Sequence, residues 1–195
     1  MSHKILIIDG HPDPKGPHFV HELTGLYRQG AKEGGHEARV LRVGAMRFPL
    51  LRNDKSYVSG KLPDSIRAAQ KLITWADHIV VLYPMWLGTM PSKLKGFFEQ
   101  VLRPGFAFAE RGPGEPPKRL LKGRSARIIV TRGMPGLFAE VDRSPRSIRN
   151  VASDVLSICG VRPVRTMVLG GTDTLTVAQR DKAQFDMRRL GAIAK

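Results

Sequence analysis

The sequence predicts a three-layer α/β protein in which helices cover both faces of a five-stranded parallel sheet. Apolar runs without polar alternation, as in residues 5–8 and 79–83, are typical of strands that are buried on both faces. These runs alternate with apolar residues at helical spacing, which favours parallel strands joined by crossover helices. No linker or internal repeat divides the 195 residues, so we expect a single domain over residues 1–195.

The first elements follow directly from this pattern. Residues 4–9 form an apolar run that ends at a Gly- and Pro-rich turn, which predicts the first strand. A helical stripe follows, with Pro17 in its first turn and Gly34 at its end. Residues 38–43 predict a second strand, whose partial alternation indicates a position near an edge of the sheet.

The middle of the chain repeats this order. Residues 44–61 are expected to be irregular, and residues 63–75 carry the spacing of a helix. Residues 78–83 predict a third strand that is buried on both faces. Ser92 is expected to cap a helix that reaches Leu102.

The remaining residues predict two further strands. Residues 103–123 are rich in Pro and Gly and are expected to form a long irregular loop. Strands are expected at residues 125–131 and 163–169, with helices at 148–158 and 174–190. Five strands in this alternation match the flavodoxin-like arrangement, with sheet order 2-1-3-4-5.

The chain is strongly basic, with 32 Lys and Arg against 17 Asp and Glu and a net charge of +15. The excess is spread along the chain, and neither a basic tail nor a nucleic-acid-binding motif is present, so no nucleic-acid partner is expected. A scattered positive field suits attraction of small phosphorylated anions. A basic surface without a specific partner is the alternative.

Cys159 is the only cysteine, which excludes an intramolecular disulfide, a CxxC pair and a cysteine-based zinc cluster. A lone thiol fits a reducing compartment. No signal-peptide pattern and no apolar stretch long enough for a membrane span is found in the sequence. We therefore expect a cytoplasmic protein with no membrane insertion.

A ligand is expected beyond the carboxyl ends of the strands, where the strand order reverses. The loops at residues 10–17, 84–91 and 131–136 meet there. Neither GxGxxG nor GxxxxGK[ST] occurs, so a dinucleotide fingerprint and a P-loop are excluded. A helix N-terminus follows the first loop, where Lys15 and His18 can assist phosphate binding.

The other two loops supply apolar surface and charge. Residues 84–91 combine Trp86, soft apolar side chains and Gly88, which suits a flat ring with a polar edge. The alternative is that the apolar side chains of this loop fill the core. Arg132 in the third loop brings a fixed positive charge that would stabilise an anionic ring, or it is an ordinary surface arginine.

Three histidines, His11, His18 and His21, raise the question of a metal site. No carboxylate cluster or HExxH pattern accompanies them. We therefore expect no metal, with His11 ordering the first loop and His21 on a helix surface.

Two long segments carry a family resemblance. Residues 76–84 and 90–102 resemble the signature of the flavodoxin-like NAD(P)H:quinone reductases, a group that includes the modulator-of-drug-activity B proteins and ancillary subunits of potassium-efflux systems. Residues 10–14 with Phe19 are similar to the phosphate loop and first helix of that family. The resemblance covers residues 3–135 well and the remainder loosely.

The resemblance implies a homodimer that binds FMN or FAD and reduces a quinone-like small molecule by two electrons from NAD(P)H. The reactive atom is then the flavin N5, so no catalytic side chain is assigned. Together with the loop chemistry, it assigns cofactor binding to a set of residues from all three loops: His11, Lys15, His18, Phe19, Pro84, Met85, Trp86, Leu87, Gly88, Thr131, Arg132 and Gly133.

Two other functions remain open. The first is a regulatory flavoprotein that serves a transporter of the potassium-efflux type, with residues 103–123 as the docking surface. The second is an electron-carrying flavodoxin, although the charge of +15 argues against a class of typically acidic proteins.

Overall fold

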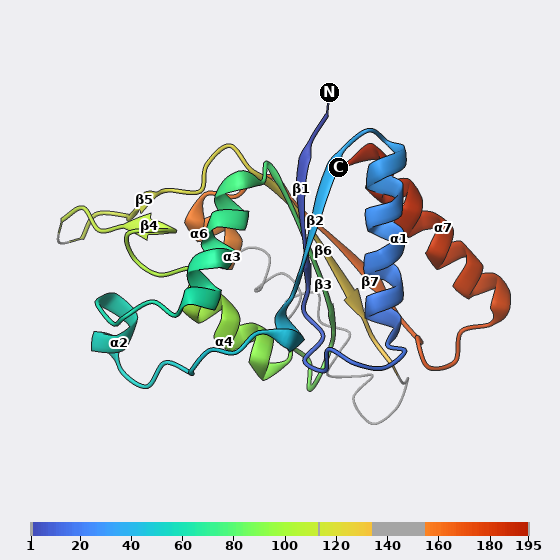
Figure 1. Ribbon diagram of the computed structural model, residues 1–195, viewed down its shortest axis with the longest axis horizontal. Helices are drawn as coiled ribbons and strands as arrows, with labels where there is room; N and C mark the ends of the chain where they lie inside the picture. Colours follow the sequence, from blue (N-terminus) through green and yellow to red (C-terminus); the bar gives the residue numbers. More distant parts are fainter. Residues whose placement is uncertain (1, 113, 134–154, 195) are drawn as a thin grey trace.

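The structure is a computed structural model that describes residues 2–112, 114–133 and 155–194 (Figure 1). Five parallel strands form its main sheet in the order β2-β1-β3-β6-β7. Their bounds are β1 Lys4–Asp9, β2 Glu37–Arg42, β3 His78–Pro84, β6 Ser125–Thr131 and β7 Val164–Leu169. When the strands of this sheet are numbered 1 to 5 along the chain, their order is 2-1-3-4-5, so the predicted fold class and sheet order are confirmed.

Burial along each strand follows its place in the sheet. Strand β1 is buried at every residue after Lys4, and β3 is buried from His78 through Tyr83. Both lie inside the sheet, where Ile7 of β1 is in register with Val80 of β3. Strands β2 and β7 are at the two edges, and their burial alternates. The continuous apolar runs therefore marked the central strands, as expected of a parallel sheet.

Helices cover both faces of the sheet (Figure 1). Helices α1 (Phe19–Glu33) and α7 (Val177–Ile193) pack on one face, over a core that includes Ile7 and Leu82. Helices α3 (Asp64–Trp75), α4 (Ser92–Val101) and α6 (Ser157–Cys159) lie on the other face, over a larger core. The sheet is the middle of three layers, as predicted.

Helices α1 and α7 cross at glycine residues. A Cβ atom at Gly30 of α1 would lie 1.8 Å from the carbonyl oxygen of Arg188, and one at Gly191 of α7 would lie 2.2 Å from that of Tyr27. No residue with a side chain fits at either position without moving a helix. Glycine is therefore required here by the close approach of two backbones.

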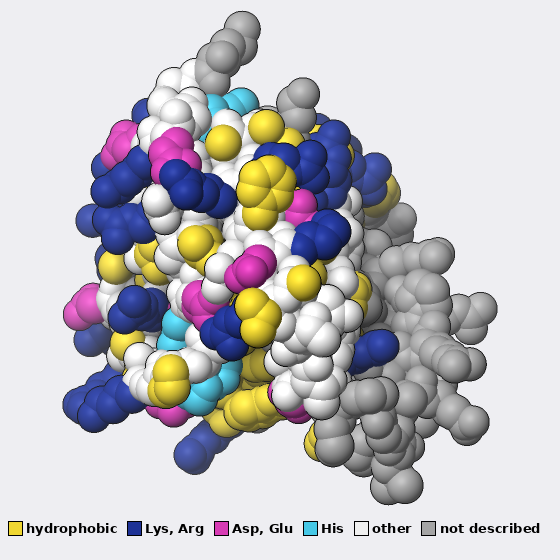
Figure 2. All heavy atoms as spheres, turned by 90° about the vertical axis from the view of Figure 1, so that its right-hand side faces the viewer, with side chains coloured by type: hydrophobic (Ala, Val, Ile, Leu, Met, Phe, Trp, Pro, Cys, Tyr) yellow, Lys and Arg dark blue, Asp and Glu magenta, His cyan; other side chains and the backbone are white. Residues whose placement is uncertain are grey.

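The outer face of this helix pair carries mixed charge. Figure 2 shows dark-blue Lys and Arg side chains scattered over this side, with acidic side chains among them. The four basic residues of α7 are paired: Arg180 with Glu22, Arg188 with Glu33, and both Lys182 and Arg189 with Asp186. This distribution agrees with a dispersed charge and does not form a continuous basic strip.

Two helix starts differ from the prediction. Pro17 was expected in the first turn of its helix, but α1 begins at Phe19 with His18 as the N-cap residue. Ser92 was expected as a cap, but it is the first residue of α4, and Pro91 occupies the cap position without a side-chain hydrogen bond. In both cases the residue at the cap position, His18 or Pro91, has an extended backbone, which is the conformation that precedes a helix.

Two segments expected to be irregular contain short elements. Residues 44–61 include the end of the 3₁₀-helix η1 (Val43–Ala45) and all of α2 (Asp54–Val58), which Asn53 caps by accepting from the Ser56 N–H group at 2.8 Å. Residues 103–123 include a two-stranded antiparallel sheet of β4 (Phe108–Ala109) and β5 (Lys118–Arg119).

The last helices are described in part. The helix predicted at residues 148–158 lies mainly outside the described residues, and only α6 at its end is seen. Helix α7 begins after a capping box formed by Thr176 and Gln179, three residues later than predicted. In the parts of the chain that the structure describes, no helix has both the length and the apolarity needed to cross a bilayer.

Candidate active site

A cleft of about 560 Å³ opens at the carboxyl ends of β1, β3 and β6, where the strand order reverses. Eleven of the twelve residues assigned from the sequence line it. The exception is Lys15, whose N–H group donates to the Asp13 carboxylate at 2.9 Å. The eleven residues are His11, His18, Phe19, Pro84, Met85, Trp86, Leu87, Gly88, Thr131, Arg132 and Gly133.

Three further residues line the cleft and were not predicted: Val20, Thr172 and Asp173. Thr172 and Asp173 follow β7, the edge strand beside β6, whose loop was not among the three loops predicted to meet at the cleft. Because ligands lie beyond the carboxyl ends of parallel strands, the position of these two residues directly after a predicted strand is the sequence signal that indicates them.

The loop after β1 is organised by the carboxylate of Asp9, which is only 1% exposed. One oxygen accepts the N–H group of His11 at 3.1 Å, and the other lies 2.5 Å from Nδ1 of His21. The loop closes over Asp13, whose carboxylate lies 2.9 Å from Nε2 of His18. Asp9 therefore joins the end of the strand to the first turn of α1.

Protonation in this loop follows burial and hydrogen bonding. Burial lowers the pKa of His11 below its usual range, because the charged ring loses water. The hydrogen bond with His18 lowers the pKa of the Asp13 carboxyl. The loop thus presents a neutral His11 ring beside an ionised Asp13 near neutral pH.

The start of α1 offers unsatisfied backbone donors to the cleft. His18 occupies the N-cap position and makes no capping hydrogen bond with its side chain. Phe19 and Val20, the first two residues of the helix, both line the cleft. Because the first N–H groups of a helix lack partners within the helix and lie at its positive end, they favour an anionic group.

The loop after β3 is a tight turn with an aromatic ring. The N–H groups of Trp86 and Thr89 each donate to the other's carbonyl oxygen, at 2.9 and 3.0 Å. The two residues between them both have positive φ, +48° at Leu87 and +76° at Gly88, as in a type I′ turn. A leucine at positive φ is strained.

The side chains of this turn do not fill the core. Trp86 is 51% exposed and Leu87 is 87% exposed. Met85 is the exception, because it packs against the larger core cluster and its N–H group donates to the carbonyl oxygen of Thr131. Trp86 and Leu87 therefore leave apolar surface at the cleft, which fits a flat ring and rejects the core-filling alternative for these two residues.

The third wall is formed by the loops after β6 and β7. Arg132 is fixed by its backbone, since its N–H group donates to Leu169 and its carbonyl oxygen accepts from Thr172. A Cβ atom at Gly133 would lie 2.3 Å from the Asp173 carboxylate, so the glycine lets that side chain approach. Residues 134–136, also assigned to this loop from the sequence, lie outside the described residues.

The cleft fits a flavin in shape and chemistry. Its volume is in the range of small-molecule sites. It combines an exposed aromatic ring, the guanidinium of Arg132 and the open N-terminus of α1, which match a flat ring, an electron-rich ring edge and a phosphate.

Comparison with known proteins identifies relatives along most of the chain. A family profile described as flavodoxin-like fold matches residues 3–190. An uncharacterized NAD(P)H oxidoreductase from Haemophilus influenzae is 28% identical over 198 residues, which cover 98% of this chain and 93% of that protein. A ribosyldihydronicotinamide dehydrogenase-like protein from Penicillium crustosum is 28% identical over 162 residues, which cover 67% of this chain and 57% of that protein.

Solved structures agree with these matches. The NAD(P)H:quinone oxidoreductase from Methanothermobacter marburgensis superposes with a TM-score of 0.80 at 26% identity, over 100% of both chains. Further curated relatives are named FMN-dependent NADH:quinone oxidoreductases. In several curated relatives, this chain spans only 39–58% of the relative's length.

Proposed function

Because the chain belongs to the flavodoxin-like fold family, we propose that it is a flavin-dependent NAD(P)H oxidoreductase that reduces a quinone-like small molecule. The observation that carries the proposal is the cleft, in which Trp86, Arg132 and the start of α1 lie together at the strand reversal. FMN is favoured over FAD, because FMN-dependent NADH:quinone oxidoreductases are among the relatives.

Different residues of the cleft bind different parts of this cofactor. The exposed faces of Trp86 and Leu87 bury the ring, and the uncapped first turn of α1 holds the phosphate. Arg132 favours the electron-rich form of the ring by its charge. When bound, the flavin supplies the atom that accepts a hydride and passes on two electrons.

The overall reaction balances without an acid–base pair on the chain. NAD(P)H gives up a hydride and becomes NAD(P)⁺, and the acceptor takes up two electrons and two protons to become a hydroquinone. The second proton comes from solvent. Because both substrates use the open side of the same cleft, we expect them to bind in turn and to give ping-pong kinetics.

Binding of FMN tests the proposal directly. Quenching of flavin fluorescence on titration with the protein should give a saturable curve with one FMN per chain. Trp86→Ala should weaken binding about tenfold, since an aromatic contact contributes about 0.5–1.5 kcal/mol beyond its buried area. Trp75→Phe is the matched control, because Trp75 ends α3 under the guanidinium of Arg39 and does not line the cleft.

Turnover is the second test. Under anaerobic conditions, NAD(P)H should bleach the bound flavin, and a quinone should restore its colour. A protein that takes up neither FMN nor FAD, or whose bound flavin is not reduced by either NADH or NADPH, would overturn the proposal.

The assembly and location are also proposals. We propose a homodimer, supported by Ile158, an exposed apolar side chain that lines a groove of about 300 Å³, and by the exposed side chains of Leu50 and Val58. Light scattering of the purified protein should give twice the chain mass of 21.6 kDa. A reducing, cytoplasmic location is supported by the single cysteine. A regulatory role for this protein on a transporter of the potassium-efflux type stays a prediction, which co-purification would test.

A further inference from the structure

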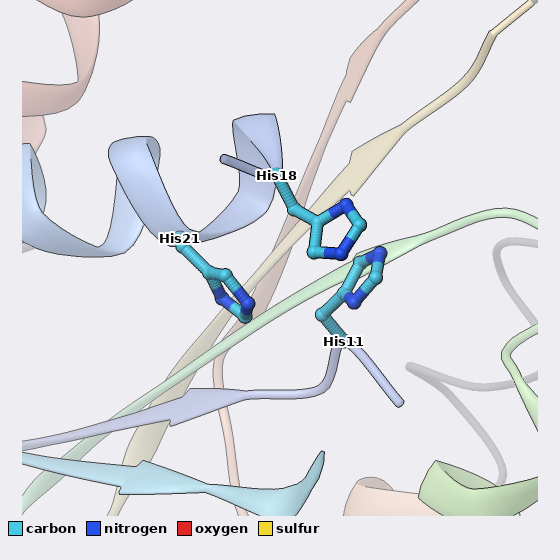
Figure 3. A group of neighbouring side chains, drawn as sticks. All are labelled: His11, His18 and His21. Carbon is cyan, nitrogen blue, oxygen red and sulfur yellow. The ribbon is translucent and has the colours of Figure 1, made fainter. Parts of the chain in front are cut away.

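Three histidine side chains converge beside the cleft although they come from different positions in the chain. His11 lies in the loop after β1, His18 caps α1, and His21 lies in the first turn of α1 (Figure 3). One ring nitrogen of each lies within 4.8 Å of those of the other two. The structure thus brings together three potential metal ligands whose spacing in the sequence matches no known metal-binding motif.

From this arrangement we propose that His11, His18 and His21 form a site for a divalent transition-metal ion of the zinc type. Imidazole nitrogens are preferred ligands of Zn²⁺, Cu²⁺ and Ni²⁺, whereas Mg²⁺ and Ca²⁺ prefer oxygen. Three protein ligands with a fourth position open is a common arrangement of zinc. His11 and His18 also line the cleft proposed for the flavin, but the proposal rests on the geometry of the three rings and not on flavin binding.

The distances require only a small closure. Nitrogens about 2.1 Å from a tetrahedral ion are about 3.4 Å apart, so the present spacing of up to 4.8 Å must shorten by about 1.4 Å. The rings of His11 and His18 are stacked with their centroids 3.8 Å apart, so one ring has to turn its edge toward the ion. The His18 side chain is 35% exposed, which leaves it room to turn.

The surroundings of His21 are those of a metal ligand. Its Nδ1 lies 2.5 Å from the buried carboxylate of Asp9, which leaves Nε2 directed away from Asp9. A carboxylate on the far nitrogen is the usual second partner of a metal-bound histidine, since it fixes the ring and makes the ligating nitrogen more basic. Here, Asp9 is itself held by the N–H group of His11.

Asp13 contacts all three rings, and a metal ion would replace its hydrogen bonds to them. Its carbonyl oxygen is 3.0 Å both from Nδ1 of His11 and from Nε2 of His21, and its carboxylate is 2.9 Å from Nε2 of His18. The carboxylate, 54% exposed, can supply the fourth ligand. Together with Asp9, it provides two negative charges to balance a divalent ion.

The test is a metal titration of the full chain, freed of metal with a chelator and of any purification tag. Calorimetry with Zn²⁺ should give one ion per chain. Co²⁺ should develop the visible absorption of a tetrahedral site without a thiolate band, because Cys159 is buried in α6 on the opposite face of the sheet.

Two variants and a control locate the ion. His18→Asn and His21→Asn should each weaken Zn²⁺ binding at least tenfold, since even losing a second partner of a ligand weakens metal affinity 10–100-fold. His3→Asn should stay within twofold. His3 is a fair control because its ring neighbours His36, 5.4 Å away, at the opposite end of β1.

Folding of each variant is checked by circular dichroism. His18→Asn preserves the test if His21→Asn fails to fold, because the His18 side chain makes no capping hydrogen bond. Site-specific binding is supported by losses in the His18 and His21 variants alone. Failure to bind one equivalent, wild-type affinity in both variants, or equal loss in His3→Asn would overturn the proposal.

Discussion

The crossing of α1 and α7 predicts opposite effects for two alanine substitutions in one helix. At Gly30, the added Cβ would lie 1.8 Å from the carbonyl oxygen of Arg188 and 2.7 Å from its carbonyl carbon. These are backbone atoms, which cannot rotate out of the way. Ordinary contact begins near 3.4 Å, so α7 must retreat by about 1.6 Å. At Gly25, the added Cβ would meet no atom within 4 Å.

The magnitudes follow from packing and helix propensity. Overpacking costs about 1–3 kcal/mol, and a rigid backbone contact places Gly30→Ala at the upper end. Alanine recovers about 1 kcal/mol of helix propensity at either position. We expect Gly30→Ala to lose about 2 kcal/mol and Gly25→Ala to gain about 1 kcal/mol. At about 2–4 °C per kcal/mol for a chain of this size, Tm falls by about 4–8 °C in the first and rises by about 2–4 °C in the second.

Urea denaturation followed by far-ultraviolet circular dichroism measures both changes, with a thermal scan beside it. Gly25→Ala is the matched control, because it makes the same chemical change in the same helix without the contact. If Gly30→Ala were as stable as Gly25→Ala, the two helices would not cross at the observed distance and the reasoning would be refuted.

Three further changes test other parts of the structure. Burial lowers the pKa of His78 from 6.5 to about 4, so between these values the unfolded chain binds a proton that the folded chain does not, and stability falls as the pH drops. In urea denaturation, His78→Gln should therefore remove about 2 kcal/mol of the stability that the protein loses between pH 7 and 5. A variant that loses as much stability as the wild type would contradict this. Thr176→Ala should cost about 1 kcal/mol in the same assay, because the hydroxyl accepts the Gln179 N–H group at 3.3 Å; a neutral result would argue against the capping box. Leu87→Asn should raise the free energy of unfolding by about 0.5–1 kcal/mol, since asparagine tolerates the φ of +48° and the leucine side chain is 87% exposed; a destabilised variant would show that the turn is not strained.

The central strands were predictable because a strand that is buried on both faces is apolar at nearly every residue. The central strands β1 and β3 are apolar almost throughout, and both matched their predicted residues to within one position. Helix starts were less predictable. Ser92 has the chemistry of a cap, but Pro91 takes that position: its ring fixes φ, and its backbone is extended, with φ −55° and ψ 144°.

Short elements escaped the prediction because contacts between distant residues stabilise them. Strands β4 and β5 have two residues each, too few for any periodicity, and Phe108 pairs with Arg119 across the segment between them. The start of α2 does carry a local signal, because asparagine is one of the residues preferred at the cap position of a helix and Asn53 occupies it.

The cleft was predictable from topology, since three loops must meet at the carboxyl ends of neighbouring strands. What topology does not contain is the approach of Asp173 to Gly133, which depends on a glycine that is 40 residues away in sequence. The convergence of His18 and His21 on His11 likewise depends on how the first loop folds around Asp9. The spacing of these histidines along the chain does not indicate how that loop folds.

One histidine ties the two ends of the chain together. His36 accepts the N–H group of His3 at Nδ1, 3.1 Å away, and its Nε2 lies 3.0 Å from the carbonyl oxygen of Ala192. His3 and Ala192 thus lie at the end of the sheet opposite the cleft (Figure 1). Immobilised on an electrode through either end, the protein would keep its cleft open to the surrounding solution.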